Sequence, residues 1–250
     1  MSQRSLEADL ERARDLSVPD LADAIEAIGF ECTQCGACCK SEGSTEGAAL
    51  GDASDEAEDP HTATVFPDEV RALQAATERE FDHEYDWRDV ARPMPYGLTE
   101  GPDGPAGETF EWALQTDACG DCTFFEEAAD GTGACTVHDD RPLICETYPF
   151  GVVLDGDELG SQPMGQAVDR EGPVRAHECE GLGRDISREG AEELARALKR
   201  RAVRELKEAI GVRDHYTPTD PGGEVVVHDS EGAKDRDGRP WGADSGTETT

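Results

Sequence analysis

Cysteines are the side chains of this sequence best suited to do chemistry, and four of the nine lie within eight consecutive positions. The segment FECTQCGACCK, residues 30–40, contains Cys32, Cys35, Cys38 and Cys39. Two residues between thiolates let both sulfurs turn toward one ion or cluster, as in zinc knuckles and iron–sulfur loops. Gly36 lets backbone amides approach sulfur closely. Because neighbouring side chains diverge, Cys38 and Cys39 are expected either to bridge two sites or to be one ligand and one reserve thiol.

Four more cysteines lie in CGDCTFFEEAADGTGACTVHDDRPLICETYPF, residues 119–150. The turn residues between Cys122 and Cys135 predict a hairpin that presents both thiols at its open end. Asp140 is a predicted helix N-cap, and Cys145 follows about one turn later. We therefore expect the helix N-terminus to lower the pKa of the Cys145 thiol. Cys179, in HECEGLG, is the last cysteine.

The elements that must position these thiols can be predicted from apolar spacing and from caps. Residues 1–29 are predicted to form two helices, the second capped by Ser17 and ended by Gly29. Residues 63–66, 110–114 and 151–154 read as strands, and Pro67 opens a helix. Residues 92–109 are rich in Pro and Gly and are expected to be a loop. The clearest helix starts at Ser187, and Gly211 is expected to end it.

These elements predict an α+β fold: a small, irregular β region with flanking helices, organised around a cysteine metal cluster. The predicted organisation is N-terminal helices at 1–29, a cysteine domain at 30–183, a packing helix at 184–216 and a mostly disordered acidic tail at 217–250. Residues 41–62 have almost no bulky apolar side chain and are predicted to be a disordered acidic insertion. Within the tail, residues 225–227 are expected to add at most one edge strand.

The charge balance is extreme, with 57 acidic and 23 basic residues and a formal net charge of −34. Self-repulsion on this scale destabilises a compact fold, and salt screens it. The charge therefore indicates a protein of a salt-accumulating, halophilic cell. An acidic tail for a basic partner would explain only residues 52–60. Nucleic acid and anionic membranes are disfavoured as partners.

No apolar run approaches the ~20 residues that span a bilayer, and the N-terminus has no signal-peptide core. We therefore expect a cytoplasmic protein that does not enter a membrane. In the cytoplasm thiols stay reduced, so a cysteine pattern indicates metal binding or catalysis more often than disulfides.

The chain resembles the CxxCxxCC family, the YkgJ-type cysteine-cluster proteins, which are described as zinc- or iron-chelating. The family pattern begins with a Phe two positions before C-x2-C-G-x-C-C, which Phe30 and the first cysteine loop match. Its later parts are a cysteine before a Phe-containing pair, a cysteine on the second hairpin arm, an Arg-Pro-x-x-Cys element, an aromatic residue before proline, and a late Cys-x-Gly. They correspond to Cys122 with Phe124 and Phe125, Cys135, Arg141 with Pro142 and Cys145, Tyr148-Pro149, and Cys179 with Gly181.

The sequence departs from the family pattern at three places. Glu146 stands where the family often has Arg, which removes a cation from the cluster region, and residues 41–62 look like an insertion. Cys119 is additional to the pattern. The resemblance covers about residues 28–183. Most members have no assigned reaction; some are iron–sulfur proteins, and the domain occurs in flagellin lysine N-methylases.

The leading hypothesis is a metal-binding protein with a zinc ion or an iron–sulfur cluster, in one site or two. Its ligands are eight thiolates: Cys32, Cys35, Cys38, Cys39, Cys122, Cys135, Cys145 and Cys179. The alternatives are a cluster-dependent oxidoreductase or lysine methylase-like enzyme, and a thiol-redox protein without metal. The odd cysteine count argues against the latter. His138 and His177 lie near cysteines and could replace a thiolate, but solvent-facing or hydrogen-bonding roles are favoured. The remaining histidines, His61, His83, His215 and His228, are assigned no role. A protein partner is possible but unspecified.

Overall fold

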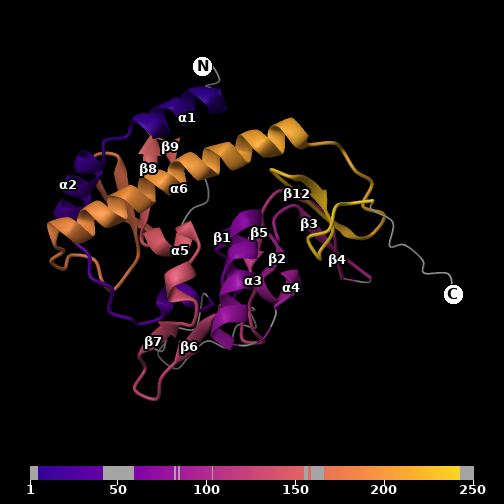
Figure 1. Ribbon diagram of the computed structural model, residues 1–250, viewed down its shortest axis with the longest axis horizontal. Helices are drawn as coiled ribbons and strands as arrows, with labels where there is room; N and C mark the ends of the chain where they lie inside the picture. The colour runs from indigo at the N-terminus through magenta and orange to yellow at the C-terminus, as the bar shows by residue number, and fades with distance from the viewer. Residues whose placement is uncertain are drawn as a thin grey trace, which may run out of the picture.

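The long helix α6 (Arg188–His215) crosses the molecule and packs against both of its halves in the computed structural model (Figure 1). The structure describes residues 5–41, 59–81, 83, 85–102, 104–154, 157–158 and 166–242. Helices and several small sheets alternate along the chain, so the predicted α+β class is confirmed. In the described part of the chain, no helix combines the length and the apolar character needed to cross a bilayer.

The remaining helices are short. They are α1 (Leu6–Asp15), α2 (Val18–Ile28), α3 (Pro67–Phe81), α4 (Trp87–Val90) and α5 (Leu143–Thr147), with 3₁₀ turns η1 (Ala37–Cys39) and η2 (His138–Asp140). The Ser17 side chain caps α2 by accepting the Asp20 amide hydrogen at 3.3 Å, as predicted. Ser187 caps α6 in the same way through Gly190, at 3.1 Å.

Within the described residues, the strands form four small sheets. The first sheet has the spatial order β1 (Thr64–Val65), β5 (Trp112–Leu114), β2 (Ala91–Pro93), and the second has β10 (Ala167–Glu171), β11 (Val174–His177), β8 (Phe150–Leu154), β9 (Asp157–Glu158). The third sheet has the order β13 (Gly232–Lys234), β12 (Val225–Asp229), β4 (Gly104–Thr109), β3 (Leu98–Gly101). The fourth is a hairpin of β6 (Phe125–Glu127) and β7 (Gly133–Cys135). Among these strands, all pairings are antiparallel except that of β12 with β4.

The buried apolar residues of the described ranges form two hydrophobic cores. The first, which we call the helical core, joins α1, α2 and α6 to β8 and β11. The second, which we call the strand core, joins α3, α4, β1, β2, β5 and β12. Arg201 of α6 lies buried between α5 and β8, where it bonds to Thr147 Oγ1 at 3.1 Å and to the Phe150 carbonyl at 3.2 Å. The hydrogen bond from Arg201 to Thr147 holds α6 against α5, the helix that carries Cys145.

The C-terminal segment is folded further than predicted. β12 is a central strand, not an edge strand, and Val225, Val226 and Val227 are at most 1% exposed. The expectation of disorder from residue 217 is therefore wrong up to residue 242; residues 243–250 lie outside the described part. The polar sequence that follows β12 can fold because Lys234 of β13 bonds to Asp229 at 2.8 Å and to Glu231 at 2.6 Å.

Three other boundaries differ from the prediction. Residues 92–109 are not a loop but hold the β3–β4 hairpin, whose Gly- and Pro-rich strands pair through backbone and show no apolar alternation. Of the predicted insertion 41–62, residues 42–58 lie outside the described part, but His61 is only 2% exposed and its amide bonds to Gly120. Gly211 does not end α6; a Cβ there would lie 2.5 Å from Cβ of Ser230, so the glycine permits close packing.

Candidate metal centre

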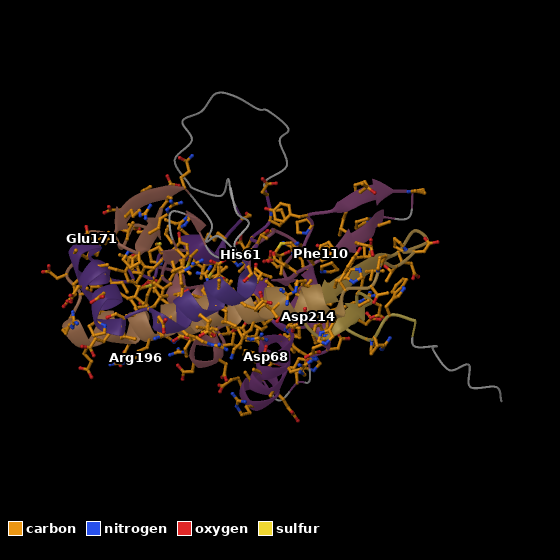
Figure 2. The ribbon with its side chains drawn as sticks, turned by 90° about the horizontal axis from the view of Figure 1, so that it is seen from above. His61, Asp68, Phe110, Glu171, Arg196 and Asp214 are labelled. Atoms are coloured by element: carbon orange, nitrogen blue, oxygen red, sulfur yellow. The ribbon has the colours of Figure 1, made fainter. Side chains whose placement is uncertain are left out.

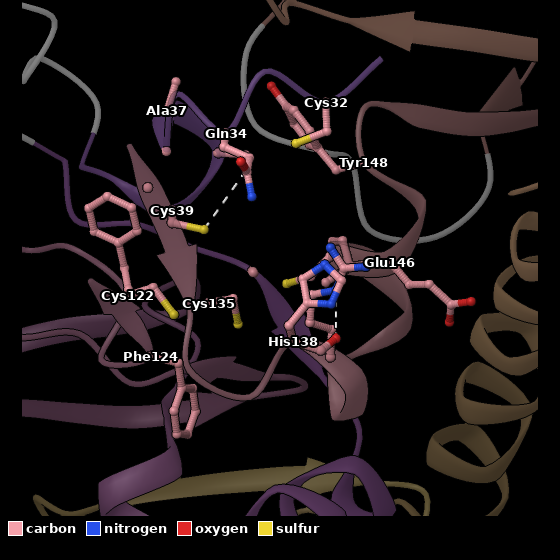
Figure 3. Close-up of a pocket in the computed structure, with 18 of the residues that line it drawn as sticks. Cys32, Gln34, Ala37, Cys39, Cys122, Phe124, Cys135, His138, Glu146 and Tyr148 are labelled. Atoms are coloured by element: carbon pink, nitrogen blue, oxygen red, sulfur yellow. Dashed lines mark hydrogen bonds between the residues drawn. The ribbon is translucent and has the colours of Figure 1, made fainter. Parts of the chain in front are cut away.

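One cavity collects the eight cysteines predicted to bind metal. Its volume is about 620 Å³, and its walls include Cys32, Cys35, Cys38, Cys39, Cys122, Cys135, Cys145 and Cys179. Figure 3 shows the side chains of Cys39, Cys122 and Cys135 on one side of this space, with Cys32 beside Tyr148 on the other. The ninth cysteine, Cys119, is exposed and is not among the lining residues. We call this space the thiol cavity.

The first cysteine loop, residues 30–40, is shaped by a glycine. Gly36 has a φ of +76° and opens the turn η1, in which the Cys39 amide bonds to the Gly36 carbonyl at 2.8 Å. A Cβ on Gly36 would lie 2.6 Å from the Phe125 ring, so both its conformation and its contact with the β6–β7 hairpin require glycine. The loop can therefore lie directly on the hairpin.

Backbone hydrogen bonds fix the loop to the hairpin. The Gly133 amide donates to the Gln34 carbonyl at 2.7 Å, and the Cys122 amide donates to the Cys39 carbonyl at 2.8 Å. The predicted hairpin is present, and Cys135 pairs with Phe125 at its open end. These bonds place Cys39, Cys122 and Cys135 around one wall of the cavity.

A second backbone crossing brings in Cys179. The Glu31 amide donates to the Gly181 carbonyl, and the Gly183 amide donates to the Gly29 carbonyl, both at 3.0 Å. A Cβ on Gly181 would collide with the Glu31 carbonyl oxygen. The Gly181 amide also donates to Sγ of Cys179 at 3.4 Å. Two segments about 150 residues apart in sequence thus place Cys32 and Cys179 on the same side of the cavity.

Cys145 lies on α5, and its pKa shifts in the direction opposite to the one predicted. Burial raises the pKa of this thiol well above its ordinary value, and Cys122, Cys38 and Cys135 raise it further. The helix is only five residues long, so it supplies little dipole to oppose these effects. Its first amide, that of Leu143, is already satisfied by Glu69 at 2.9 Å. The expected lowering is therefore wrong, because desolvation dominates.

Electrostatic interactions divide the thiols into two sets. The hairpin set contains Cys39, Cys122, Cys135 and Cys145. Burial raises the pKa of Cys122 to about 12, and Cys135 and Cys38 contribute to this shift. The pKa of Cys39 is raised by its hydrogen bond with Cys38, by burial, and by Cys122 and Cys145. The loop set contains Cys32, Cys35 and Cys179: burial raises the pKa of Cys179, and Cys35, Cys38 and Cys32 add to it. Cys38 acts on both sets, as expected of a thiol between them.

The adjacent cysteines do not diverge as predicted. The 3₁₀ turn holds Sγ of Cys38 and Sγ of Cys39 3.8 Å apart. A hydrogen bond from the Cys39 thiol lowers the pKa of Cys38 to about 7, and the positive charge of Arg141 helps, although burial opposes both. Cys38 is therefore the thiol of this pair that ionises first.

Cationic side chains near the cavity come from three elements. Arg141, part of the predicted Arg-Pro element, lines the cavity and also acts to lower the pKa of Cys135, which burial raises. Lys40 pairs with Glu127 beside the Phe125 ring. Glu146, which replaces the arginine of the family pattern, bonds to Arg200 at 2.7 Å. Its charge is therefore offset by α6.

Histidines were the weakest part of the sequence prediction. His61, assigned no role, lines the cavity, and burial lowers its pKa to about 4. No spacing signal connected it with the cysteines, because it follows the acidic segment 42–58. His138 also lines the cavity, with an exposed side chain, whereas His177 is buried on β11 and is not among the lining residues.

The donor set suits soft metal ions. Thiolates with imidazole nearby favour zinc, iron or iron–sulfur clusters over hard cations. In the described part of the chain, no three His, Cys, Asp or Glu side chains already stand in an arrangement that could hold a metal ion. The structure thus gathers the predicted ligands around one space, and binding would require rotation of several side chains.

This fold and site define a mixed α+β protein with a cysteine-lined cavity between two cores. The chain belongs to the CxxCxxCC family, "Putative zinc- or iron-chelating domain", whose model matches residues 31–180. No curated protein and no solved structure matched the chain. The family confirms the resemblance drawn from the cysteine spacing, and it supports zinc or iron chelation.

Proposed function

We propose that this protein binds iron or zinc through the eight cysteines of the thiol cavity. The observation that supports the proposal is that eight of the nine cysteines line one cavity. Thiols from the first cysteine loop, the β6–β7 hairpin region, α5 and the segment after β11 reach one cavity, whereas Cys119 does not. A shared role in hydrogen bonding or core packing would not exclude the ninth cysteine in this way.

The proposed arrangement is two neighbouring sites. The hairpin set supplies four thiolates, and the loop set supplies three, to which Cys38 adds a fourth or a bridge. We favour iron–sulfur over zinc, because a cavity of about 620 Å³ is larger than a closed tetrahedral zinc site with ~2.3 Å zinc–sulfur bonds needs. When bound, such a cluster would supply electron transfer.

The proposed setting is a reducing, salt-rich cytoplasm. All nine cysteines lie in described residues, and none forms a disulfide. Reduced thiols are the form that binds metal. The net charge of −34 is suited to high salt, where repulsion between carboxylates is screened.

Anaerobic purification in high salt, followed by metal and sulfide analysis and a visible spectrum, tests the proposal. Iron with acid-labile sulfide and a brown chromophore is the expected result. Colourless protein with stoichiometric zinc would replace the cluster with a zinc site. Protein that binds neither metal after anaerobic reconstitution would contradict the proposal.

Single cysteine variants test the two-site arrangement. Cys145→Ser removes a ligand of the hairpin set and Cys179→Ser one of the loop set, so each should lower the metal content to about half. Cys35→Ser should act like Cys179→Ser. The matched control is Cys119→Ser, which should keep full metal content. Full metal in the cavity variants, or loss of metal from the control, would contradict the ligand assignment.

A further inference from the structure

The adjacent cysteines Cys38 and Cys39 form a pair whose sulfurs already stand at a chelating distance. Their Sγ atoms lie 3.8 Å apart in the 3₁₀ turn η1. Two sulfurs bound to one atom through bonds of ~2.3 Å, the length of a zinc–sulfur bond, can be at most ~4.6 Å apart. Within the described ranges, no group of three or more His, Cys, Asp or Glu side chains stands ready to hold a metal ion. The pair therefore suits a ligand that needs two sulfurs and not four.

Hydrogen bonds on both sides hold the backbone of the pair in place. The Cys39 amide donates to the Gly36 carbonyl at 2.8 Å, which closes the turn. The Cys39 carbonyl accepts the amide hydrogen of Cys122, also at 2.8 Å. Just after the pair, the Ser41 amide donates to Oδ1 of Asp121 at 2.8 Å. The backbone that carries both sulfurs is thus fixed, which lowers the entropy lost when the two bind one ligand.

The surroundings of the pair are accessible and mainly apolar. Both cysteines are half-buried and line the thiol cavity, whose volume is about 620 Å³. Cys39 packs on the strand core, and Figure 3 shows it on the same side of the cavity as Phe124. The cavity wall also includes Leu114, Phe125 and Ile144. A ligand held by the two sulfurs can therefore place an organic group against apolar side chains, whose burial is favourable.

Coordination number selects the class of ligand. Zinc ions and iron–sulfur clusters take about four protein ligands, which this cavity can supply only after side chains rotate. A disulfide would need the two sulfurs ~2.05 Å apart, far closer than 3.8 Å. Trivalent arsenic that carries one organic group is soft and pyramidal, and it binds two further atoms. Its bonds to sulfur are close in length to those of zinc, and at a right angle they would place the two sulfurs roughly 3.3 Å apart, about half an ångström closer than in the structure.

We propose that Cys38 and Cys39 form a chelating site for a trivalent organoarsenical, R–As(OH)₂. In the binding step the two thiols replace the two hydroxyls: two arsenic–sulfur bonds form, two arsenic–oxygen bonds break, and each thiol proton leaves with a hydroxyl as water. Arsenic stays trivalent and sulfur stays reduced, so the step needs no oxidant. The organic group lies against the apolar wall of the cavity. The site uses two of the thiols proposed to bind metal, but it is present in the metal-free protein and does not rest on the proposed function.

Titration of the reduced, metal-free, full-length protein with phenylarsine oxide tests the proposal. An excess of mercaptoethanol, a monothiol, is kept present so that single cysteines cannot retain the arsenical, whereas a chelating pair can. One arsenical per chain should bind, as measured by intact-mass spectrometry, and dimercaptopropanol, a dithiol, should remove it. The absence of an adduct in the presence of the monothiol would overturn the proposal.

Cysteine variants locate the arsenical. Cys38→Ser and Cys39→Ser each leave one sulfur of the pair, so each should weaken binding about 100-fold. The matched controls are Cys35→Ser, in the same loop, and Cys119→Ser, outside the cavity, and both should bind like the parent. Unchanged binding in the first two variants, or an equal loss in Cys35→Ser, would place the arsenical on other thiols and overturn the proposal.

Protection from alkylation in the parent chain gives an answer that does not depend on how a variant folds. After the arsenical binds, iodoacetamide treatment and peptide mass spectrometry should find Cys38 and Cys39 protected. Cys32 and Cys119, which are both exposed, should be alkylated. Protection of other cysteines in place of this pair would overturn the proposal.

Discussion

At the scale of single residues, the thiol cavity is a place where metal ions must compete with protons. Burial and neighbouring thiols raise the pKa of Cys122 to about 12 and also raise those of Cys135, Cys145 and Cys179. The pKa of Cys38 is instead lowered to about 7, chiefly by the hydrogen bond with Cys39. At neutral pH most of these groups are thiols, so a metal ion that binds must release their protons.

This competition predicts how pH changes the stability of the metal-free protein. A thiol whose pKa is higher in the folded than in the unfolded state stabilises the fold. This stabilisation is complete at pH values below the unfolded-state pKa, and it is lost as the pH rises toward the folded-state pKa. For Cys122 the window runs from 9.0 to about 12. The free energy of unfolding should therefore fall across this window, by up to about 1.4 kcal/mol per pH unit for each such thiol.

Urea unfolding of reduced, chelator-treated protein across this pH window measures the effect. Cys122→Ala should make the fall less steep, because one titrating group is removed. Cys119→Ala, outside the cavity, should leave the slope unchanged. A stability that stays flat or rises with pH would show that the buried thiols do not titrate as inferred.

The sequence singled out the eight cysteines that line the cavity, through their spacing and the family pattern. For Gly36 it predicted close approach of amides to sulfur, whereas the structure shows a positive φ and a close contact with the Phe125 ring. The sequence could not predict the sign of the Cys145 shift, which depends on burial by distant segments. His61 was missed for the same reason: its place in the cavity wall depends on a backbone bond to Gly120, and no nearby residue signals that bond.

At the scale of elements, the cavity depends on backbone crossings that only glycine allows. The crossing of residues 29–31 with residues 181–183 is the clearest, because its hydrogen bonds set the separation of Cys32 from Cys179. Gly181 does not have a positive φ, so a side chain there causes no backbone strain. A substitution at Gly181 therefore tests only the close approach of residue 181 to the Glu31 carbonyl oxygen.

Gly181→Ala should force the two segments apart. The added Cβ would collide with backbone oxygen, which cannot move like a flexible side chain, so we expect a loss of about 1–3 kcal/mol in stability and weaker metal binding by the loop set. Gly151→Ala is the matched control, because Gly151 also has an ordinary φ and has no atom within 4 Å of the added Cβ. Chemical denaturation and metal analysis of both variants provide the measurement, and equal effects would contradict a specific role for the crossing.

The predicted helices α2 and α6 were found where expected, whereas the β3–β4 hairpin and the central place of β12 were missed, for a physical reason. α2 and α6 are signalled by capping serines and by apolar residues at helical spacing, all of which are local. β4 pairs with β12, more than 100 residues later, through Gly- and Pro-rich backbone. Such pairing depends on a partner strand that the local sequence does not reveal. The sequence therefore predicted a loop in place of the β3–β4 hairpin, and an edge strand in place of the central strand β12.

At the scale of the whole molecule, the thiol cavity lies where the two cores meet. Phe30 and Leu182 pack on the helical core, whereas Cys39, Cys135 and Cys145 pack on the strand core. A metal held by both sets of thiols would therefore connect the two halves, in addition to α6. Metal binding should accordingly stabilise the whole fold, because an ion that binds only the folded state shifts the equilibrium toward it.

Net charge acts on the same scale, and two electrostatic effects oppose each other. Arg188 of α6 bonds to Asp23 and Glu26 of α2, at 2.5 and 2.7 Å, and salt weakens such pairs. Exposed pairs of this kind contribute only about 0–1 kcal/mol each. Repulsion in a chain with a net charge of −34 acts between many carboxylates at once, and salt weakens it too. We expect the second effect to be larger.

The melting temperature should therefore rise, by about 10 °C, between ~0.1 M and ~1 M potassium chloride, as the screening length falls from ~10 Å to ~3 Å. Neutralising exposed carboxylates with Glu126→Gln and Glu171→Gln (Figure 2) should raise the melting temperature in low salt and have little effect in high salt, because the repulsion they relieve is already screened there. Sucrose at equal osmolality, which screens no charge, should not reproduce this convergence of variant and parent. A melting temperature that falls with salt, or variants that gain equally at both concentrations, would show that ion pairs, not net repulsion, govern the stability of this fold.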